Sequence, residues 1–139
     1  MRTQAQAQPA TPFQFRLDLR SGVPVYRQII DQVLLAIASG TLSGGDQLPT
    51  VRQVAVDLSI NPNTVVRAYR ELEIRGILTT QQGTGTFITS EKVKRDEVER
   101  ERQLAQLVGD FVARAGAAGF RLQELLDHLR EFAAEPERK

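Results

Sequence analysis

The sequence predicts an α+β fold of three helices and a β-hairpin, followed by a short all-α region of two helices. Three observations support this prediction. Apolar residues recur at helical spacing in five separate stretches of the chain. Only three residues, 59–61, separate the second stretch from the third. Two strand-like runs rich in Ile, Thr and Phe, residues 77–81 and 86–89, then flank a glycine-rich turn at residues 82–85.

The composition sets limits on the class of protein. A length of 139 residues accommodates one domain with an extension, or two small units. The absence of Cys excludes disulfides and thiolate metal sites. The N-terminus lacks the apolar core of a signal peptide, and the longest apolar stretch, residues 33–38, is far shorter than the ~20 residues of a membrane span. We therefore expect a cytoplasmic protein without membrane contact.

The N-terminal part is expected to be a disordered segment followed by a scaffold helix. Residues 1–12 are rich in Gln, Ala and Pro, which predicts disorder. Residues 13–19 alternate apolar and polar side chains and predict a short extended arm. Pro24 suits the first turn of a helix that ends at Gly40, and residues 42–49 are expected to form a loop. The apolar residues of that helix are Tyr26, Ile29, Ile30, Val33, Leu34 and Ile37.

The second and third helices are predicted to form a helix-turn-helix. Thr50 and Gln53 have the spacing of a capping box at the start of the second helix, in which each side chain satisfies a free backbone N–H. Asn61 suits the N-cap of the third helix and Pro62 its first residue, and Gly76 ends it. The predicted buried positions are Val51, Val54, Ala55 and Leu58 in the second helix and Val65, Ala68, Tyr69 and Leu72 in the third. With the hairpin, these helices predict a winged helix-turn-helix domain over residues 13–90.

The outer face of the third helix carries the side chains expected to contact duplex DNA. An α-helix fits the major groove, where the residues near its N-terminus reach the base edges. Asn63 can bond adenine, Thr64 can contact phosphate or a thymine methyl group, and Arg67 can bind guanine or phosphate. A glycine-rich hairpin tip can approach the sugar-phosphate wall closely. The predicted DNA-binding residues are Arg52, Asn63, Thr64, Arg67, Arg70, Gln82, Gly83 and Thr84.

Residues 91–139 are expected to form a two-helix dimerisation region. Mixed charges over residues 91–103 predict an exposed helix, and a hinge is expected at 116–119. A helical hairpin of this size is marginal by itself, so we expect a homodimer with a four-helix-like core; the alternative is that the apolar stripes pack on the winged helix of the same chain. A small-molecule effector bound near that core could change the separation of the two DNA-binding heads. The predicted interface residues are Leu104, Leu107, Val108, Phe111, Val112, Leu122, Leu125, Leu126, Leu129 and Phe132.

Two other classes of function fit the sequence less well. A winged helix used as a protein-interaction module would need an apolar or acidic outer face on the third helix; Val66 and Ile74 favour it, but Asn63, Arg67 and Arg70 oppose it. An enzyme is not expected, because the single His, His128, falls outside its apolar stripe and the sequence has no phosphate loop or His/carboxylate metal spacing. No catalytic residue, cofactor or metal is therefore predicted.

The spaced positions of residues 16–89 resemble the winged-helix domain of GntR-family transcriptional regulators. The matching motifs run from Pro24-Val-Tyr-Arg-Gln-Ile through Leu48-Pro49-Thr50-x-Arg52, Asn61-Pro62-Asn63-Thr64-Val65 and Gly83-Thr84-Gly85-Thr86-Phe87. The Asn-Pro-Asn-Thr-Val form and the short C-terminal region are similar to the YtrA subfamily. The resemblance implies a homodimeric regulator, most simply a repressor on a pseudo-palindromic operator, with contacts from Arg52, Asn63, Thr64 and Gly83. Pro62 and Val66 replace residues that are often DNA-contacting Arg in larger branches, which shifts weight to Asn63 and Arg67.

Overall fold

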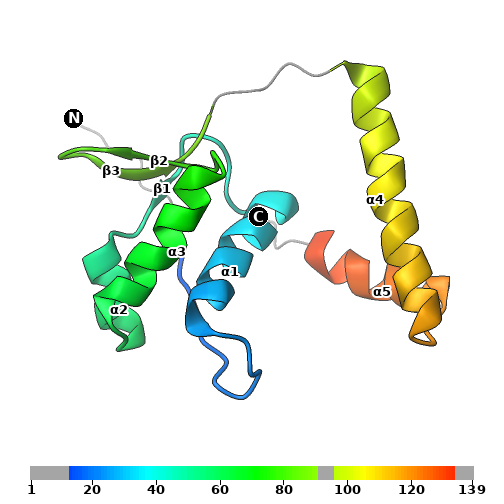
Figure 1. The fold of residues 1–139 in the computed structure, drawn as a ribbon, viewed down its shortest axis with the longest axis horizontal. Helices are drawn as coiled ribbons and strands as arrows, with labels where there is room; N and C mark the ends of the chain where they lie inside the picture. The colour runs from blue at the N-terminus through cyan, green and yellow to red at the C-terminus, as the bar shows by residue number, and fades with distance from the viewer. Residues whose placement is uncertain (1–12, 91–95, 134–139) are drawn as a thin grey trace, which may run out of the picture. The chain divides into compact units, whose positions relative to one another are not determined.

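The chain divides into two compact units, residues 1–90 and 91–139. The computed structural model describes residues 13–90 and 96–133 (Figure 1). The disorder expected for residues 1–12 and the first residues of the charged helix expected from residue 91 lie outside the described residues. Each unit is described by itself.

The first helix, α1 (Val25–Ser39), confirms the predicted scaffold helix. Pro24 is its N-cap and therefore lies one position before the first turn, where its missing N–H costs no helical hydrogen bond. Gly40 ends the helix with a φ of 85°, a left-handed conformation that glycine adopts without a Cβ clash.

The helix-turn-helix consists of α2 (Val51–Leu58) and α3 (Pro62–Ile74), as the sequence predicts. The Thr50 hydroxyl accepts a hydrogen bond from the Gln53 N–H at 3.1 Å. The prediction that the Gln53 side chain in turn satisfies the Thr50 N–H is wrong. The Gln53 amide instead donates to the Asp57 carboxylate one turn later, at 3.1 Å. At α3 the Asn61 carboxamide oxygen accepts from the Asn63 N–H at 2.8 Å, which caps the helix.

The wing is a three-stranded antiparallel sheet with the order β1-β3-β2. The hairpin strands are β2 (Leu78–Gln81) and β3 (Gly85–Ile88), close to their predicted bounds. The strand β1 (Gln47–Leu48) was not predicted, because residues 42–49 were expected to form a loop. A strand of two residues is too short to show a period of two, and its pairing with β3 joins residues about forty positions apart: Gln47 lies opposite Phe87 and Leu48 opposite Thr86.

Residues 13–24, the described part of the chain before α1, form no strand and are anchored by glutamine side chains. The Gln32 amide bonds both backbone groups of Arg16, donating to its carbonyl and accepting from its N–H. Gln28, which is buried, accepts from the Asp18 N–H and donates to the Asp18 carbonyl at 2.9 and 3.0 Å. These bonds replace the ladder that a neighbouring strand would supply and hold Phe15 in the core.

One hydrophobic core fills the space between α1, α2, α3 and the sheet. All four apolar residues predicted for α3 are buried, and α1 packs directly against this face of α3. In α2 only Val54 and Ala55 are buried, whereas Val51 and Leu58 are half-buried at its edges. The largest fully buried side chains are Ile29, Ile30, Val33, Leu48, Val54, Val65 and Leu72.

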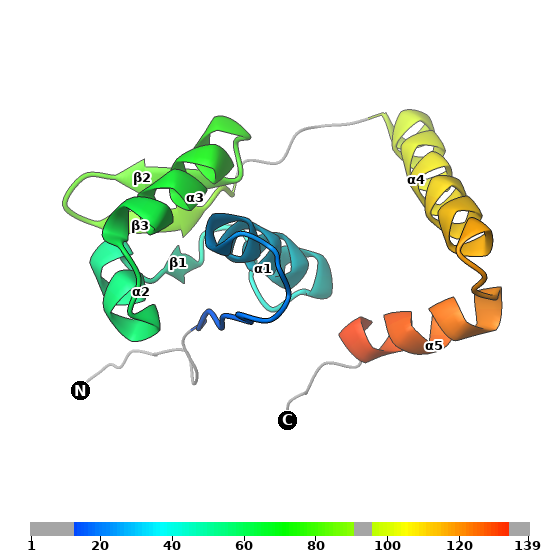
Figure 2. The same ribbon diagram turned by 60° about the horizontal axis from the view of Figure 1, so that its bottom comes forward.

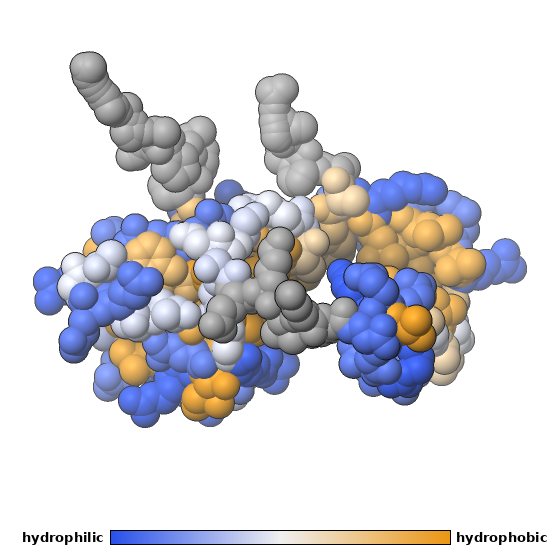
Figure 3. Space-filling view, turned by 90° about the horizontal axis from the view of Figure 1, so that it is seen from above, coloured by the Kyte–Doolittle hydropathy of each residue, from blue (hydrophilic) through white to orange (hydrophobic). Residues whose placement is uncertain are grey.

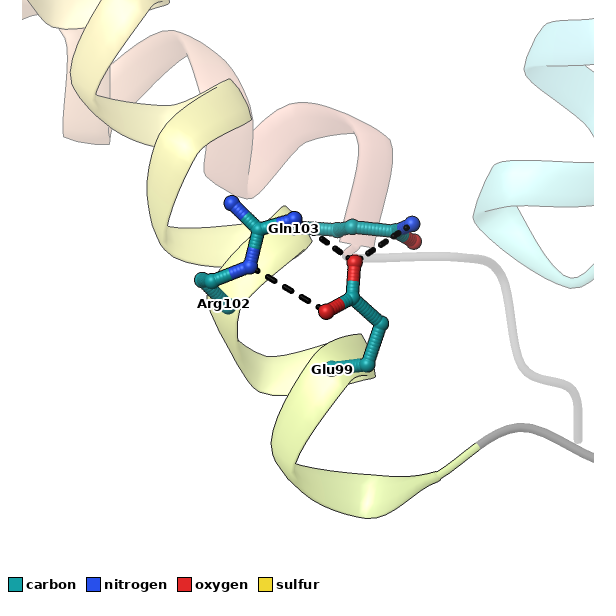
Figure 4. A network of polar contacts seen from close by, with 3 residues as sticks. All are labelled: Glu99, Arg102 and Gln103. Atoms are coloured by element: carbon teal, nitrogen blue, oxygen red, sulfur yellow. Dashed lines mark hydrogen bonds and ion pairs between the residues drawn. The ribbon is translucent and has the colours of Figure 1, made fainter.

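The C-terminal unit consists of α4 (Glu97–Ala117) and α5 (Leu122–Ala133). The hinge expected at 116–119 lies two residues further along the chain, at 118–121, because α4 continues through Ala117 and α5 begins at Leu122. Near the start of α4 the Arg102 guanidinium donates to both carboxylate oxygens of Glu99, at 2.6 and 3.2 Å, and Gln103 donates to one of them (Figure 4). The hydrogen bond from Arg102 lowers the pKa of the Glu99 carboxyl. Within the described residues, no helix has the length and apolar character needed to cross a membrane.

Replacing Tyr69 by Phe tests the polar link within the core. The Tyr69 hydroxyl donates to the Pro49 carbonyl at 2.6 Å and so ties α3 to the residue before the α2 cap. Removing it leaves that carbonyl without its partner, and we expect a loss of about 1–2 kcal/mol in the free energy of unfolding, measured by urea denaturation. Equal stability of the variant and the wild type would contradict this role.

The same variant has a distinct pH dependence. Burial raises the pKa of the Tyr69 phenol above its ordinary value of about 10. The contribution of Tyr69 to the free energy of unfolding of the wild type should therefore be fully present below about pH 10. It should be lost as the pH rises further, because the unfolded chain releases this proton first. In the Tyr69→Phe variant the part of this alkaline loss that comes from Tyr69 should disappear.

Candidate nucleic-acid interface

The exposed face of α3 brings together most of the residues predicted to contact bases. Asn63, Arg67 and Arg70 are exposed on this face, opposite the residues buried against α1. Thr64 is half-buried at its edge, with its N–H bonded to the Asn61 carbonyl at 3.0 Å. A shallow hollow of about 340 Å³ follows the face and is lined by Asn63, Val66, Arg67, Arg70, Glu71 and Ile74.

The charges on this face favour a polyanion. Among the described residues, Arg67 and Arg70 form no ion pair, so both cations are available to phosphate or guanine. Glu71 is the acidic residue that lines the hollow, and its carboxylate is paired with Arg75 one turn later, at 3.2 Å. The net effect is an uncompensated positive charge in the middle of the helix face.

Arg67 lies over the aromatic ring of Tyr26, a residue predicted only as part of the scaffold helix. Its guanidinium carbon lies 3.7 Å from the centroid of the Tyr26 ring on α1. This distance is well within the range of a cation–π interaction. The sequence offered no sign of this contact, because Tyr26 fits the apolar periodicity of α1 and lies about forty residues before Arg67.

Arg52 is exposed at the second position of α2, among the first residues after the Thr50 cap. It forms no ion pair within residues 13–90 and is not one of the residues that line the hollow on α3. Its place at the N-terminal end of α2, where backbone N–H groups also point outward, is compatible with a phosphate contact.

The wing tip is a three-residue turn, Gln82–Thr84, that joins β2 to β3 (Figure 2). Gln82, Gly83 and Thr84 are all exposed there. The Gln47 side chain, from the unpredicted strand β1, donates to the Thr84 carbonyl at 3.1 Å. Gly85 has a φ of 136°, and a Cβ at this position would collide with the Gln47 amide. The positive φ therefore favours glycine at position 85, and a Cβ there would also displace the Gln47 amide that connects the tip to the body of the sheet.

The apolar stripes of α4 and α5 are largely exposed in the single chain. Among the ten predicted interface residues, Val112 and Leu125 are half-buried and the other eight are exposed, with Leu107 at 68% and Phe111 at 46%. Figure 3 shows apolar surface gathered on this unit, at the right of the view. The structure therefore leaves a hydrophobic surface on α4 and α5 that the unit itself does not bury.

The described residues contain no group of three His, Cys, Asp or Glu side chains arranged to hold a metal ion. His128 is exposed on α5, where its ring nitrogen lies 3.3 Å from the Glu124 carbonyl of the preceding turn. Its surroundings are those of an ordinary surface side chain on a helix.

A helix with free arginines on its outer face, preceded by a short helix and followed by a projecting hairpin, defines a winged helix-turn-helix DNA-binding protein. Residues 25–88 match the model of the family described as bacterial regulatory proteins, gntR family. The chain belongs to this GntR family, as the sequence predicted. It is therefore a DNA-binding transcriptional regulator and not an enzyme.

Similarity extends beyond the DNA-binding domain. The chain is 41% identical over 125 residues to the HTH-type transcriptional repressor YtrA of Bacillus subtilis, covering 86% of this chain and 92% of that protein. A solved structure of YtrA from Sulfolobus acidocaldarius, a GntR-family transcription factor, is 32% identical with a TM-score of 0.52, and covers 84% of this chain and 94% of that one. A transcriptional antiterminator from Listeria monocytogenes has the same fold, at 23% identity and a TM-score of 0.67, over 93% of this chain and 99% of that one.

Replacing Gln47 by Ala tests how the wing tip is held. Without the amide, the Thr84 carbonyl loses its hydrogen bond, so we expect faster amide hydrogen exchange at the tip and a loss of about 1 kcal/mol in stability. Hydrogen exchange followed by NMR measures the first effect and urea denaturation the second. Gln53→Ala is the matched control, since Gln53 bonds only within α2 and its loss should leave exchange at the tip unchanged. Unaltered exchange in Gln47→Ala would contradict the anchoring role.

Proposed function

We propose that the protein represses transcription by binding, as a homodimer, to a pseudo-palindromic operator. The observation that carries the proposal is the outer face of α3, where Arg67 and Arg70 are exposed without acidic partners in the described part of the chain and flank the same hollow as Asn63. The relative of Bacillus subtilis is named a repressor, which supports this direction of control. Occupation of a promoter is sufficient to block it.

Each exposed group has a role that follows from its chemistry. Asn63, at the second position of α3, is placed to bond an adenine edge, and Arg67, one turn further, to bond guanine or phosphate. Thr64 at the edge of the face, Arg70 on the face itself and Arg52 at the start of α2 contact phosphate oxygens and fix the orientation of the domain. Gln82, Gly83 and Thr84 follow the sugar-phosphate backbone from the wing.

The homodimer is supported by the exposed stripes of α4 and α5. Ten large apolar side chains among the described residues, eight of them predicted interface residues, are exposed in one unit of fewer than fifty residues, which is more than a small soluble domain ordinarily leaves uncovered. Two such units, related by a twofold axis, can bury the stripes against each other in a four-helix core. A twofold dimer presents two α3 helices to half-sites separated by about one DNA turn or a multiple of it.

A small-molecule effector stays a prediction, to which the structure assigns no residue. The proposed activity places the protein in the compartment that holds the chromosome, the cytoplasm.

The alternative function as a protein-interaction module is favoured by the exposure of Val66, at 41%, and Ile74, at 75%. Membership of a DNA-binding family and the free arginines weigh against it.

Arg67→Ala tests the recognition face. The operator is taken as the duplex that the wild-type protein selects from a random-sequence library. Removing Arg67 should weaken binding by roughly 1–3 kcal/mol and relax the preference for one base pair, measured by fluorescence anisotropy on that duplex and its single-base variants. Wild-type affinity should also fall steeply with salt, since several phosphates release counterions.

Arg130→Ala is the matched control for this experiment. Arg130 lies on α5, where it is exposed and pairs with Asp127 at 3.1 Å, so its removal should leave operator affinity unchanged. The assignment of Arg67 fails if Arg67→Ala binds as tightly as the wild type. A flat salt response would contradict DNA binding through the basic face.

Phe111→Glu tests the dimer. A carboxylate in the middle of the α4 stripe would have to be buried without a partner, so we expect a monomer in analytical ultracentrifugation. Loss of the second DNA-binding head should weaken operator binding by more than about tenfold. Asp110→Asn, at the neighbouring exposed position outside the stripe, should remain dimeric. A dimer that survives Phe111→Glu would show that the stripe is not the interface.

A further inference from the structure

We propose that Tyr26 is a positioning residue for DNA recognition, because it holds the Arg67 guanidinium in the orientation that binds the operator. The inference rests on the proposed function, in which Arg67 contacts a base or phosphate. Its starting point is the stacking of the two side chains, with the guanidinium carbon 3.7 Å from the centroid of the Tyr26 ring. This contact joins α1, which carries none of the predicted DNA-binding residues, to the exposed face of α3.

Stacking leaves the hydrogen-bonding groups of Arg67 free. The N–H donors of a guanidinium lie in its plane, whereas the ring covers one of its faces. Arg67 can therefore donate two parallel hydrogen bonds to guanine or phosphate while it remains on the ring. An arginine that is already ordered loses less conformational freedom on binding than one that moves freely in solvent.

The ring itself stands on a rigid support. Tyr26 is half-buried in the first turn of α1, two residues before the buried Gln28. The Gln28 amide donates to the Asp18 and Val23 carbonyls, at 3.0 and 2.9 Å, and so fixes the chain that enters the helix. Ile29 and Ile30, the next residues, are fully buried in the core. Tyr26 is thus fixed relative to α3, as a residue that positions another side chain must be.

Arg70 provides the contrast on the same face. Within the described residues it has neither an aromatic ring beneath it nor an acidic partner. Arg70 therefore has the properties of a mobile phosphate contact, whereas Arg67 has those of a pre-oriented group. We therefore expect the base preference of the protein to depend on Tyr26 through Arg67. The contribution of Arg70 to DNA affinity should be independent of Tyr26.

The test uses full-length variants and the duplex selected by the wild-type protein from a random library. Tyr26→Phe keeps the ring and should bind within about twofold of the wild type, and Tyr26→Leu should bind about two- to fivefold more weakly. In the Arg67→Ala background Tyr26→Leu should cause no further loss, whereas in an Arg70→Ala background its full effect should remain. Single-base variants of the duplex should show the loss at the same base pair that Arg67→Ala affects.

Pentafluorophenylalanine at position 26 separates the electrostatic contribution of the ring from its packing. Fluorine withdraws electron density from the ring face and removes its attraction for a cation, while the ring keeps its shape. This variant should bind as weakly as Tyr26→Leu and unfold at nearly the same temperature as Tyr26→Phe. It also keeps the test decisive if Tyr26→Leu proves unstable.

Three results would overturn the inference. An equal loss in Tyr26→Phe and Tyr26→Leu would assign the effect to the hydroxyl, as in a direct phosphate contact. Equal losses from Tyr26→Leu with and without Arg67 would show that the ring acts independently. If the pentafluorophenylalanine variant bound the duplex with wild-type affinity, the ring would act on Arg67 through packing alone. Failure of the proposed function is distinguishable, because Arg67→Ala itself would then retain full affinity.

Discussion

The burial of one face of α3 is the constraint on which the rest of the structure depends. Val65, Ala68 and Leu72 are inaccessible to solvent because α1, α2 and the sheet pack around them. In a helix, fixing one face fixes the opposite one, so this burial alone turns Asn63 and Arg67 outward. The position of the recognition face is thus a direct consequence of hydrophobic packing.

Polar contacts refine what the core establishes. Tyr69 continues the buried face of α3, and its hydroxyl reaches the carbonyl that precedes α2, so the two helices of the helix-turn-helix are linked by a hydrogen bond as well as by packing. The same principle applies on the outer side, where Tyr26 supports Arg67. In both cases an aromatic side chain forms a contact between α3 and another part of the winged-helix unit.

The two units solve the problem of burial differently. The winged-helix unit covers most of its apolar residues with its own elements, whereas α4 and α5 leave most of theirs exposed. Two helices alone cannot enclose a core, since each stripe can face only the other. A second copy of the unit supplies the missing layer in the proposed dimer, and the same association would provide the two DNA-binding heads that a pseudo-palindromic operator requires.

The sequence by itself determined the helices, the turn, the hairpin and the polar face of α3, because apolar periodicity, Asn61-Pro62 at the helix start and glycines at the turns are local signals. It also predicted the family. Only the tertiary structure decided that Gln47 belongs to a third strand and donates a hydrogen bond to the wing tip. It also decided that the Arg67 guanidinium lies over the Tyr26 ring. These contacts join residues about forty positions apart. Their side chains meet because the core brings α1, β1 and the hairpin together, and a single sequence carries no local pattern from which such pairs can be derived.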